Sequence, residues 1–156
     1  MMNQSYTRLI WAGISVLTLG IVVTFCRAQE EEASPLVARC DLEIYSISAP
    51  SSASRGSVIS VSDVTTNIGN AAAISSTSDI YICTNVNYVT SGSKVGSHVV
   101  APIAAGRSSA WSGSVTVPAK QPLGTNYYIV VANGNRLAVE SNYANNTNYV
   151  PIIINP

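Results

Sequence analysis

Side chains that could carry out chemistry are few in this sequence, and they are scattered. The chain has one histidine, His98, and no serine stands in a Gly-x-Ser-x-Gly motif. A hydrolase needs a nucleophile, a base and an orienting group within mutual reach, and no second acid at a useful spacing joins Asp63. We therefore expect a protein that is not an enzyme and needs no cofactor, with His98 as a surface side chain on an edge strand.

Asp63 is nevertheless unusual for its position. It alternates with Ile59 and Val61, so regular strand geometry points its carboxylate to the same side as these apolar side chains. A buried carboxylate must be hydrogen-bonded or neutralised. The pattern predicts either a β-bulge or a buried hydrogen bond from a nearby hydroxyl group.

Two of the three cysteines, Cys40 and Cys83, lie beyond the N-terminal apolar segment. An exported protein meets an oxidising compartment, in which two cysteines can pair. The chain has no Cys-x-x-Cys motif, and one pair without a cluster of histidines or acids cannot complete a zinc site. We expect a structural Cys40–Cys83 disulfide, with two free thiols as the alternative.

The aromatic residues offer surfaces for contact. Trp111 alternates with Val115 and Val117, which favours packing in the core, and its alternative role is an exposed contact for a sugar or a protein. The tyrosines present the same choice, because several of the eight must face outward. Trp111, Tyr143 and Tyr149 are therefore the candidates for contact with a partner.

The N-terminus has the order of a secretory signal peptide. Arg8 precedes seventeen uncharged residues, Leu9–Phe25, and small residues then stand three before and one before a cleavage point that follows Ala28. Cleavage there would remove residues 1–28. The alternatives are a lipid on Cys26 or an uncleaved membrane anchor, since about 17 to 25 apolar residues span a bilayer. In either alternative the chain contacts the membrane.

Removing residues 1–28 from the 156 leaves 128 residues with six Lys and Arg and eight Asp and Glu. Three of these acids form the tract Glu30–Glu32, so residues 29–38 are interpreted as an acidic linker. The charge balance offers no basic surface for nucleic acid. One domain, residues 39–156, is the expected number for this length.

Beyond the linker, short runs of alternating apolar and polar residues are separated by turn-forming residues. This pattern is typical of β-strands, and no stretch keeps the 3.6-residue period of an amphipathic helix. Seven strands are predicted, which fits a two-sheet sandwich. Their ranges are 41–49, 57–66, 77–84, 94–100, 108–117, 126–133 and 148–154. The predicted core consists of Leu42, Ile44, Ile59, Val61, Ile80, Ile82, Val115, Val117, Tyr128 and Val130.

Several short motifs occur in a distinctive order. They are Ala49-Pro50 followed by Gly56, then Thr66-Asn67-Ile68-Gly69, Ile80-Tyr81-Ile82, Ile103-Ala104-Ala105-Gly106, Val117-Pro118-Ala119, Leu123-Gly124-Thr125-Asn126-Tyr127-Tyr128 and Glu140-Ser141-Asn142-Tyr143-Ala144-Asn145-Asn146. Together they resemble the CARDB family, the cell-adhesion-related domain of bacteria and archaea, over nearly all of residues 40–156. The resemblance implies an all-β fold, an immunoglobulin-like seven-stranded antiparallel sandwich of secreted and surface proteins. It implies no chemical reaction.

The last of these motifs holds the only candidate for metal binding. Glu140, Asn142 and Asn145 offer oxygen ligands of the kind that Ca²⁺ prefers. CARDB proteins often place acids at three positions where this chain is neutral, so that Glu140 stands among uncharged amides. We therefore expect no metal, and we expect these side chains to satisfy open backbone groups in the turn before the last strand.

Export, a sandwich fold and the lack of a catalytic group together favour a non-catalytic binding or structural module. It would be secreted or held at the cell surface, with the periplasm as a further location, and would adhere to a protein or a carbohydrate. One alternative is a self-assembling subunit of an extracellular fibre or coat, suggested by low charge and the apolar final strand at 150–154. A minor alternative is a hydrolase inhibitor that acts through the loop at 85–93.

Overall fold

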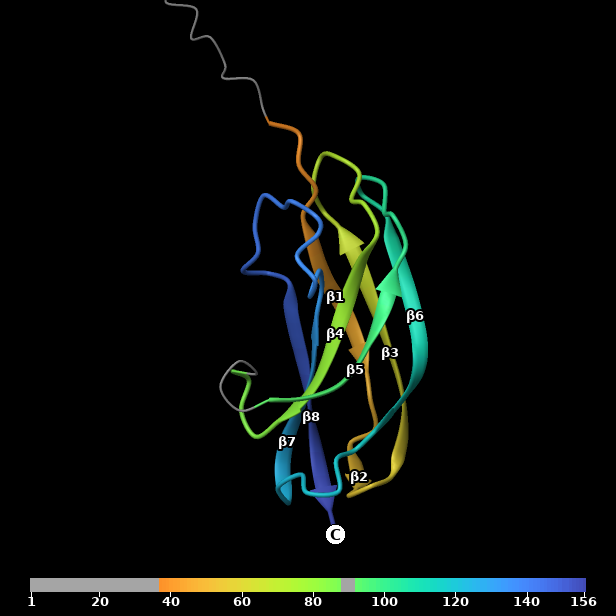
Figure 1. Cartoon of the computed structure of the whole chain (residues 1–156), viewed down its shortest axis with the longest axis vertical. Helices are drawn as coiled ribbons and strands as arrows, with labels where there is room; N and C mark the ends of the chain where they lie inside the picture. The colour runs from red at the N-terminus through yellow and green to blue at the C-terminus, as the bar shows by residue number, and fades with distance from the viewer. Residues whose placement is uncertain (1–36, 88–91) are drawn as a thin grey trace, which may run out of the picture. The chain divides into compact units, whose positions relative to one another are not determined.

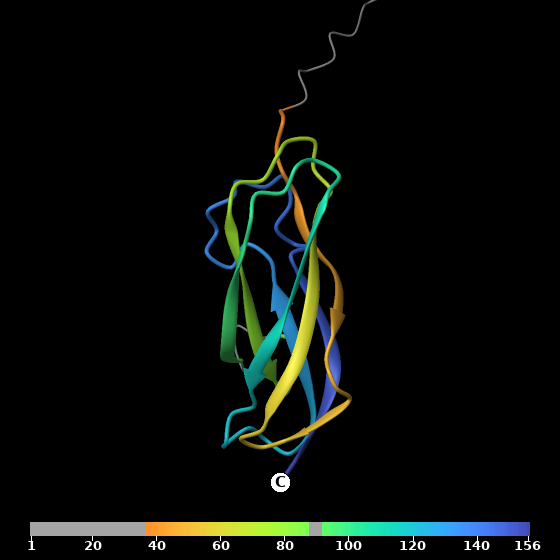
Figure 2. The same cartoon turned by 90° about the vertical axis from the view of Figure 1, so that its right-hand side faces the viewer.

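The computed structural model describes residues 37–87 and 92–156. These residues form a three-stranded sheet of order β1-β3-β6 and a five-stranded sheet of order β2-β8-β7-β4-β5. Figure 1 shows the strands running along the length of the domain, and Figure 2 shows β3 and β6 in front of the five-stranded sheet. The strands are β1 (Leu42–Ser48), β2 (Ser52–Ser54), β3 (Val58–Asn67), β4 (Ser76–Cys83), β5 (Ser93–Val100), β6 (Ser108–Thr116), β7 (Gly124–Val131) and β8 (Thr147–Asn155).

The core lies between the two sheets. In β3, buried residues alternate with more exposed ones along the whole strand, because successive side chains of a strand point to opposite faces. All ten residues of the predicted core are buried, which confirms that prediction. Full burial of one such side chain contributes about 1.5–3 kcal/mol, so the apolar face of each sheet requires the other sheet as cover.

The all-β sandwich predicted from the sequence is confirmed, and the structure adds one strand that the prediction missed. The three-residue strand β2 pairs in parallel with the end of β8, where Ser52 lies opposite Ile153 and Ser54 opposite Asn155. The five-stranded sheet is therefore not purely antiparallel. Within β2 only Ala53 is buried, so the strand is too short for any alternation to reveal it.

The apolar final strand is explained by the core. In β8, Ile152 and Ile154 are 0% and 2% exposed and belong to the main hydrophobic cluster. β8 pairs with β7 along its length, whereas β2 covers only Ile153–Asn155 at its end, so one edge of the sheet consists of β2 with the rest of β8 and the other edge is β5. Burial in the core accounts for these two isoleucines, and self-assembly through β8 stays a prediction.

Both cysteines are free and buried. Cys40 packs in the main core, and its thiol lies 3.4 Å from the carbonyl oxygen of Val139. Cys83 belongs to a second buried cluster with Ile129 and Val131. Along β4 and β7 these side chains alternate with those of the main core, so this second cluster lies on the outer face of the five-stranded sheet.

The predicted Cys40–Cys83 disulfide is therefore wrong. Cys40 follows Arg39, whose carbonyl oxygen accepts a hydrogen bond from the backbone of Asn70 in the segment that leads into β4. Cys83 is the last of the eight residues of β4. At about 3.3 Å per residue the strand carries the chain more than about 20 Å away, whereas a disulfide requires Cα atoms within about 7 Å.

The signal peptide predicted for residues 1–28 and most of the predicted linker, residues 29–36, lie outside the described residues. So do residues 88–91 of the loop proposed for an inhibitor. Among the residues that the structure does describe, no helix is long and apolar enough to cross a membrane.

Candidate functional site

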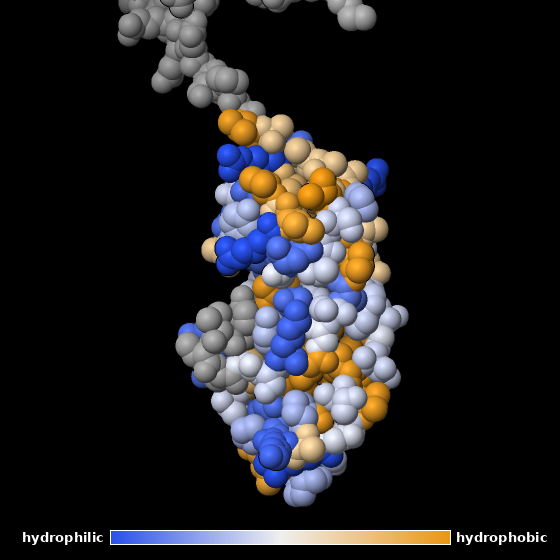
Figure 3. All heavy atoms as spheres, viewed as in Figure 1, coloured by the Kyte–Doolittle hydropathy of each residue, from blue (hydrophilic) through white to orange (hydrophobic). Residues whose placement is uncertain are grey.

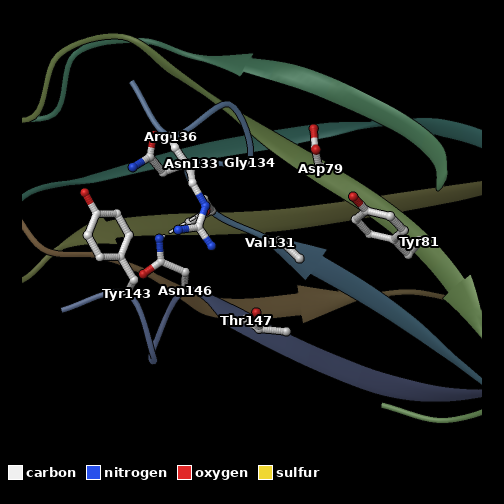
Figure 4. A pocket seen from close by; sticks show the side chains of 10 residues that line it. Asp79, Tyr81, Val131, Asn133, Gly134, Arg136, Tyr143, Asn146 and Thr147 are labelled. Atoms are coloured by element: carbon white, nitrogen blue, oxygen red, sulfur yellow. Dashed lines mark hydrogen bonds between the residues drawn. The ribbon is translucent and has the colours of Figure 1, made fainter. Parts of the chain in front are cut away.

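A pocket of about 150 Å³ opens on the outer face of the five-stranded sheet, at the carboxyl end of β7 (Figure 4). Asp79 of β4, Val131 of β7 and Thr147 of β8 lie side by side there, because the strand register pairs Asp79 with Val131 and Val131 with Thr147. Tyr81 stands on the same face as Asp79, two residues further along β4. The sheet thus supplies the floor of the pocket and one of its walls.

The loop that joins β7 to β8 supplies the opposite wall and is organised by a buried carboxylate. Glu140 is 2% exposed. Its Oε2 accepts a hydrogen bond from the backbone nitrogen of Leu42 at 2.5 Å, and its Oε1 accepts from Nδ2 of Asn133 at 2.6 Å and of Asn146 at 2.8 Å. Three N–H donors compensate the buried negative charge. The loop is therefore tied to β1 and to the end of β7.

Asn133 and Arg136 hold the tightest part of this loop. Their φ angles are 50° and 53°, and the left-handed region is uncommon for a residue with a long side chain such as arginine. The backbone nitrogen of Arg136 donates to the carbonyl oxygen of Asn133 at 2.8 Å. The Asn133 side chain in turn exchanges hydrogen bonds with both backbone polar groups of Ala138. The surrounding hydrogen bonds thus maintain a strained backbone at Arg136.

The Arg136 guanidinium reaches into the middle of the pocket (Figure 4). It lies 5.6 Å from the ring centroid of Tyr143, close enough for a cation–π contact. Asp79 lies across the pocket, but its carboxylate forms an ion pair with Lys94 at 2.8 Å. That hydrogen bond raises the pKa of Lys94 and keeps it protonated. Among the described residues Arg136 has no ion-pair partner.

The three aromatic candidates lie in three different places. Trp111 packs against the main core, as its alternation predicts. Tyr143 is 42% exposed and lines the pocket. Tyr149 is 46% exposed on β8 and meets Tyr127 edge to face, with ring centroids 5.6 Å apart. The structure therefore leaves Tyr143 and Tyr149 open to a partner, on the same face of the sheet.

Sequence reasoning did not single out Arg136 or Asp79. Arg136 has one local signal, because it directly follows the Asn133–Asn135 turn in a chain with few charges. The other residues of the pocket come from β4 and from Tyr143, seven residues later in the same loop, so no short motif contains the set.

The Ca²⁺ candidate does not fit this geometry. Both carboxylate oxygens of Glu140 accept from N–H donors, which would turn positive hydrogens toward a bound cation. Oδ1 of Asn142 accepts from the backbone nitrogen of Ala144 at 2.9 Å, and Asn145 directs its Nδ2 to Asp41. Throughout residues 37–87 and 92–156, no group of three or more His, Cys, Asp or Glu side chains could hold a metal ion.

The prediction that His98 is a surface residue is wrong. Its side chain is 6% exposed, and its Nε2 lies 2.9 Å from Oδ2 of Asp63, whose side chain is 1% exposed. The imidazole also stacks on the indole of Trp111, with ring centroids 4.1 Å apart and the planes within 1° of parallel. Asp63 does have a buried partner, but that partner is an imidazole instead of the predicted hydroxyl. The pair lies between the sheets and is not part of the pocket.

A second, larger pocket of about 260 Å³ lies at the end of the domain where the described chain starts, at residue 37. Ile74, Leu137 and Val139 line it and are each more than half exposed. Figure 3 shows apolar atoms gathered at this end. Its lining has few polar groups that could orient a ligand, so the first pocket is the stronger candidate for specific recognition.

The sequence from residue 39 to residue 150 matches the CARDB family model. The chain belongs to the CARDB family. Its fold is also that of a CARDB domain from Pyrococcus furiosus, solved in complex with two metal ions, with a TM-score of 0.57 and 15% identity over 75% of this chain and 90% of that one. The metal ions belong to the Pyrococcus domain, and the residues described above do not reproduce a metal site here.

Two further solved structures share the CARDB fold. A domain of a Methanosarcina acetivorans protein classed as a cell-surface protein has a TM-score of 0.56 and 16% identity, over 75% of this chain and 93% of that domain. A β-glucosidase from Listeria innocua, solved as a mutant with laminaribiose, has a TM-score of 0.51 and 13% identity over 75% of this chain, but the match spans 16% of the enzyme. At these identities the likeness concerns the fold alone. No curated protein matches the chain.

Proposed function

We propose that this CARDB chain is a non-catalytic binding module, exported to the cell surface or the extracellular space, which adheres to a protein or carbohydrate through the Arg136 pocket. The observation that supports this most is the guanidinium held in the pocket without an ion-pair partner among the described residues. A strained backbone that positions an unpaired charge at a surface pocket is typical of a binding site.

Membership of the CARDB family and the Methanosarcina neighbour support a location at the cell surface. The absence of a reactive group near the pocket supports binding without turnover. Asp79 is engaged by Lys94, and His98 and Asp63 are enclosed between the sheets. None of the three is free to act as a base on a ligand held by Arg136.

Retention of the purified full chain on isolated cell-surface material tests the binding function. We expect that Arg136→Gln and Tyr143→Ala each reduce retention at least tenfold, because each removes a group that faces the pocket. Arg107→Gln is the matched control, since it removes an exposed arginine that does not line the pocket. Equal retention of all four proteins would overturn the proposal.

Export is tested independently by intact mass spectrometry of culture fluid and membrane fractions. A soluble species that begins at Gln29 is the expected result. A membrane species that carries lipid on Cys26 or retains residues 1–28 would make the module a tethered one. A full-length chain confined to the cytosol would contradict an extracellular role.

A further inference from the structure

The chemistry of the Arg136 pocket restricts the ligand that it can take, provided that the pocket is the binding site proposed above. Of the two charged groups that line it, Asp79 is matched by Lys94 at 2.8 Å. Arg136 contacts the ring of Tyr143 and has no ion-pair partner in the described part of the chain. The pocket therefore carries one uncompensated positive charge, which favours a ligand with an anionic group.

The shape of the anionic group follows from the guanidinium. Its planar fork of N–H donors matches the two oxygens of a carboxylate, and such paired hydrogen bonds are shorter and stronger than neutral ones. The left-handed backbone at Arg136 directs its side chain into the pocket, and the guanidinium lies over the Tyr143 ring. The guanidinium is exposed and therefore accessible to a carboxylate from solvent.

The neutral lining points to a sugar as the carrier of the carboxylate. Tyr143 and Tyr81 stand on opposite sides of the guanidinium, with the hydroxyl of Thr147 below it (Figure 4). Phenol rings pack against the apolar faces of a ring-shaped ligand. The Tyr143 hydroxyl accepts from the backbone nitrogen of Glu140 and donates to the carbonyl oxygen of Ala138, which holds this ring at the edge of the pocket. The volume of about 150 Å³ is below the range of pockets for drug-sized ligands. A pocket of this volume suits a single sugar residue of a longer polysaccharide.

The surface beyond the pocket fits the continuation of such a chain. In the next row of the sheet Tyr81, Ile129 and Tyr149 lie side by side across β4, β7 and β8. Tyr149 is 46% exposed and is braced edge to face by Tyr127. Ile129 is buried beneath Tyr81 and Tyr127, so Tyr149 is the exposed aromatic ring of this row that a continuing chain could contact.

We infer that the pocket binds a uronate residue of an acidic polysaccharide, with the carboxylate paired to Arg136 and the sugar ring placed on the Tyr81 side of the guanidinium. Binding involves no covalent step. The partner is thus a carbohydrate, recognised by a carboxylate on a sugar ring.

Calorimetric titration of the full chain with three probes tests the inference. The probes are a galacturonate trisaccharide, the neutral galactose trisaccharide and a tri-aspartate peptide. We expect the galacturonate to bind at least tenfold more tightly than either of the others, and to bind more weakly as salt concentration rises. Arg136→Gln should remove this preference, whereas Arg136→Lys should retain part of it, because lysine keeps the charge but not the fork. Arg107→Gln should bind as the unaltered chain does.

The outcomes separate this inference from the proposed function. Equal binding of the neutral trisaccharide, or tighter binding of the peptide, would overturn the uronate assignment while an Arg136-dependent binding module remains. Failure of the galacturonate to bind, together with Arg136-dependent retention on surface material, would also reject the inference alone. If Arg136→Gln changes neither measurement, both proposals fail.

Discussion

Nε2 of His98 and Oδ2 of Asp63 lie 2.9 Å apart inside the sandwich, although the two residues belong to different sheets. Asp63 lies opposite Trp111 in the β3–β6 pairing, and Trp111 stacks on the same imidazole. The contact therefore joins β5, the edge of one sheet, to β3 and β6 of the other. At this side of the sandwich the two sheets are joined by a polar contact, whereas the main core joins them by apolar packing.

Loss of the imidazole should destabilise the domain strongly. His98→Ala leaves the Asp63 carboxylate buried without its partner, so we expect the free energy of unfolding to fall by about 3 kcal/mol. Chemical denaturation of His98→Ala, Asp63→Ala and the double variant should give a coupling energy of about 2 kcal/mol. Ser97→Ala, an exposed neighbour in β5, should change stability by less than about 0.5 kcal/mol. Strictly additive losses would mean that the pair contributes nothing.

Gly113 is required by the indole of Trp111. A Cβ atom at Gly113 would overlap the six-membered ring of that side chain. Gly113→Ala should therefore displace Trp111 from His98, reduce stability by about 1–3 kcal/mol and weaken the near-ultraviolet circular dichroism signal. Ser112→Ala, the exposed neighbour, serves as the control. An unchanged dichroism spectrum for Gly113→Ala would contradict the stacked arrangement.

The sequence predicted this fold well wherever burial follows the two-residue period, as it does along β3. It failed at β5, where His98 faces the core while Val99 is 72% exposed, so that the apolar pattern is inverted. The reason is that the partners of His98 come from the opposite sheet and supply a carboxylate and an indole. A single strand cannot reveal a polar position that becomes favourable only through such partners.

Glu140 should be essential for the order of the loop between β7 and β8. In Glu140→Gln one oxygen becomes an NH₂ group that faces an N–H donor, so a buried hydrogen bond is lost and two donors oppose one another. We expect a loss of about 2–3 kcal/mol and weaker binding at the Arg136 pocket, measured by denaturation and titration. Asn142→Ala removes one exposed hydrogen bond and should cost less than about 1 kcal/mol. A stability loss for Glu140→Gln as small as that of the control would disprove the central role of the carboxylate.

Calcium should have no effect on this domain. Glu140 is surrounded by N–H donors, so neither millimolar Ca²⁺ nor a chelator should shift the thermal midpoint of the full chain. An increase of several degrees with Ca²⁺ would show that the oxygens of this loop do bind the ion.

Stability should decline in alkaline solution. Burial raises the pKa of Cys40 and of Cys83 above the usual thiol value of 9.0, with the charge of Glu140 adding to the effect on Cys40. Burial, and then the charge of Asp63, raises the pKa of Tyr128 above its usual 10.0. The folded chain thus keeps protons that the unfolded chain has released, so the free energy of unfolding is full below about pH 9 and falls above it.

Tyr128→Phe should flatten the part of this decline that lies above about pH 10, as measured by denaturation at a series of pH values. Tyr45→Phe, which alters a tyrosine that is 70% exposed, is the matched control. A decline above pH 10 that is as steep in Tyr128→Phe as in the control would contradict this assignment.

The pocket could be predicted only in part. Tyr143 followed from the need for some tyrosines to face outward, but Arg136, Asp79 and Tyr81 are brought together by the pairing of β4 with β7 and by the left-handed turn at Arg136. The disulfide failed for the related reason that the distance between Cys40 and Cys83 depends on the direction of β4. Both features depend on contacts between segments far apart in the chain.

The most direct test of the binding site is a map of backbone amide chemical shifts on the full chain, recorded with and without the surface polysaccharide fraction that retains it. The account predicts that the shifts change around Asp79–Tyr81, Val131–Arg136 and Tyr143–Tyr149, and that Arg136→Gln abolishes the changes. Changes confined to the three-stranded sheet, or changes that persist in Arg136→Gln, would place binding elsewhere and contradict the account.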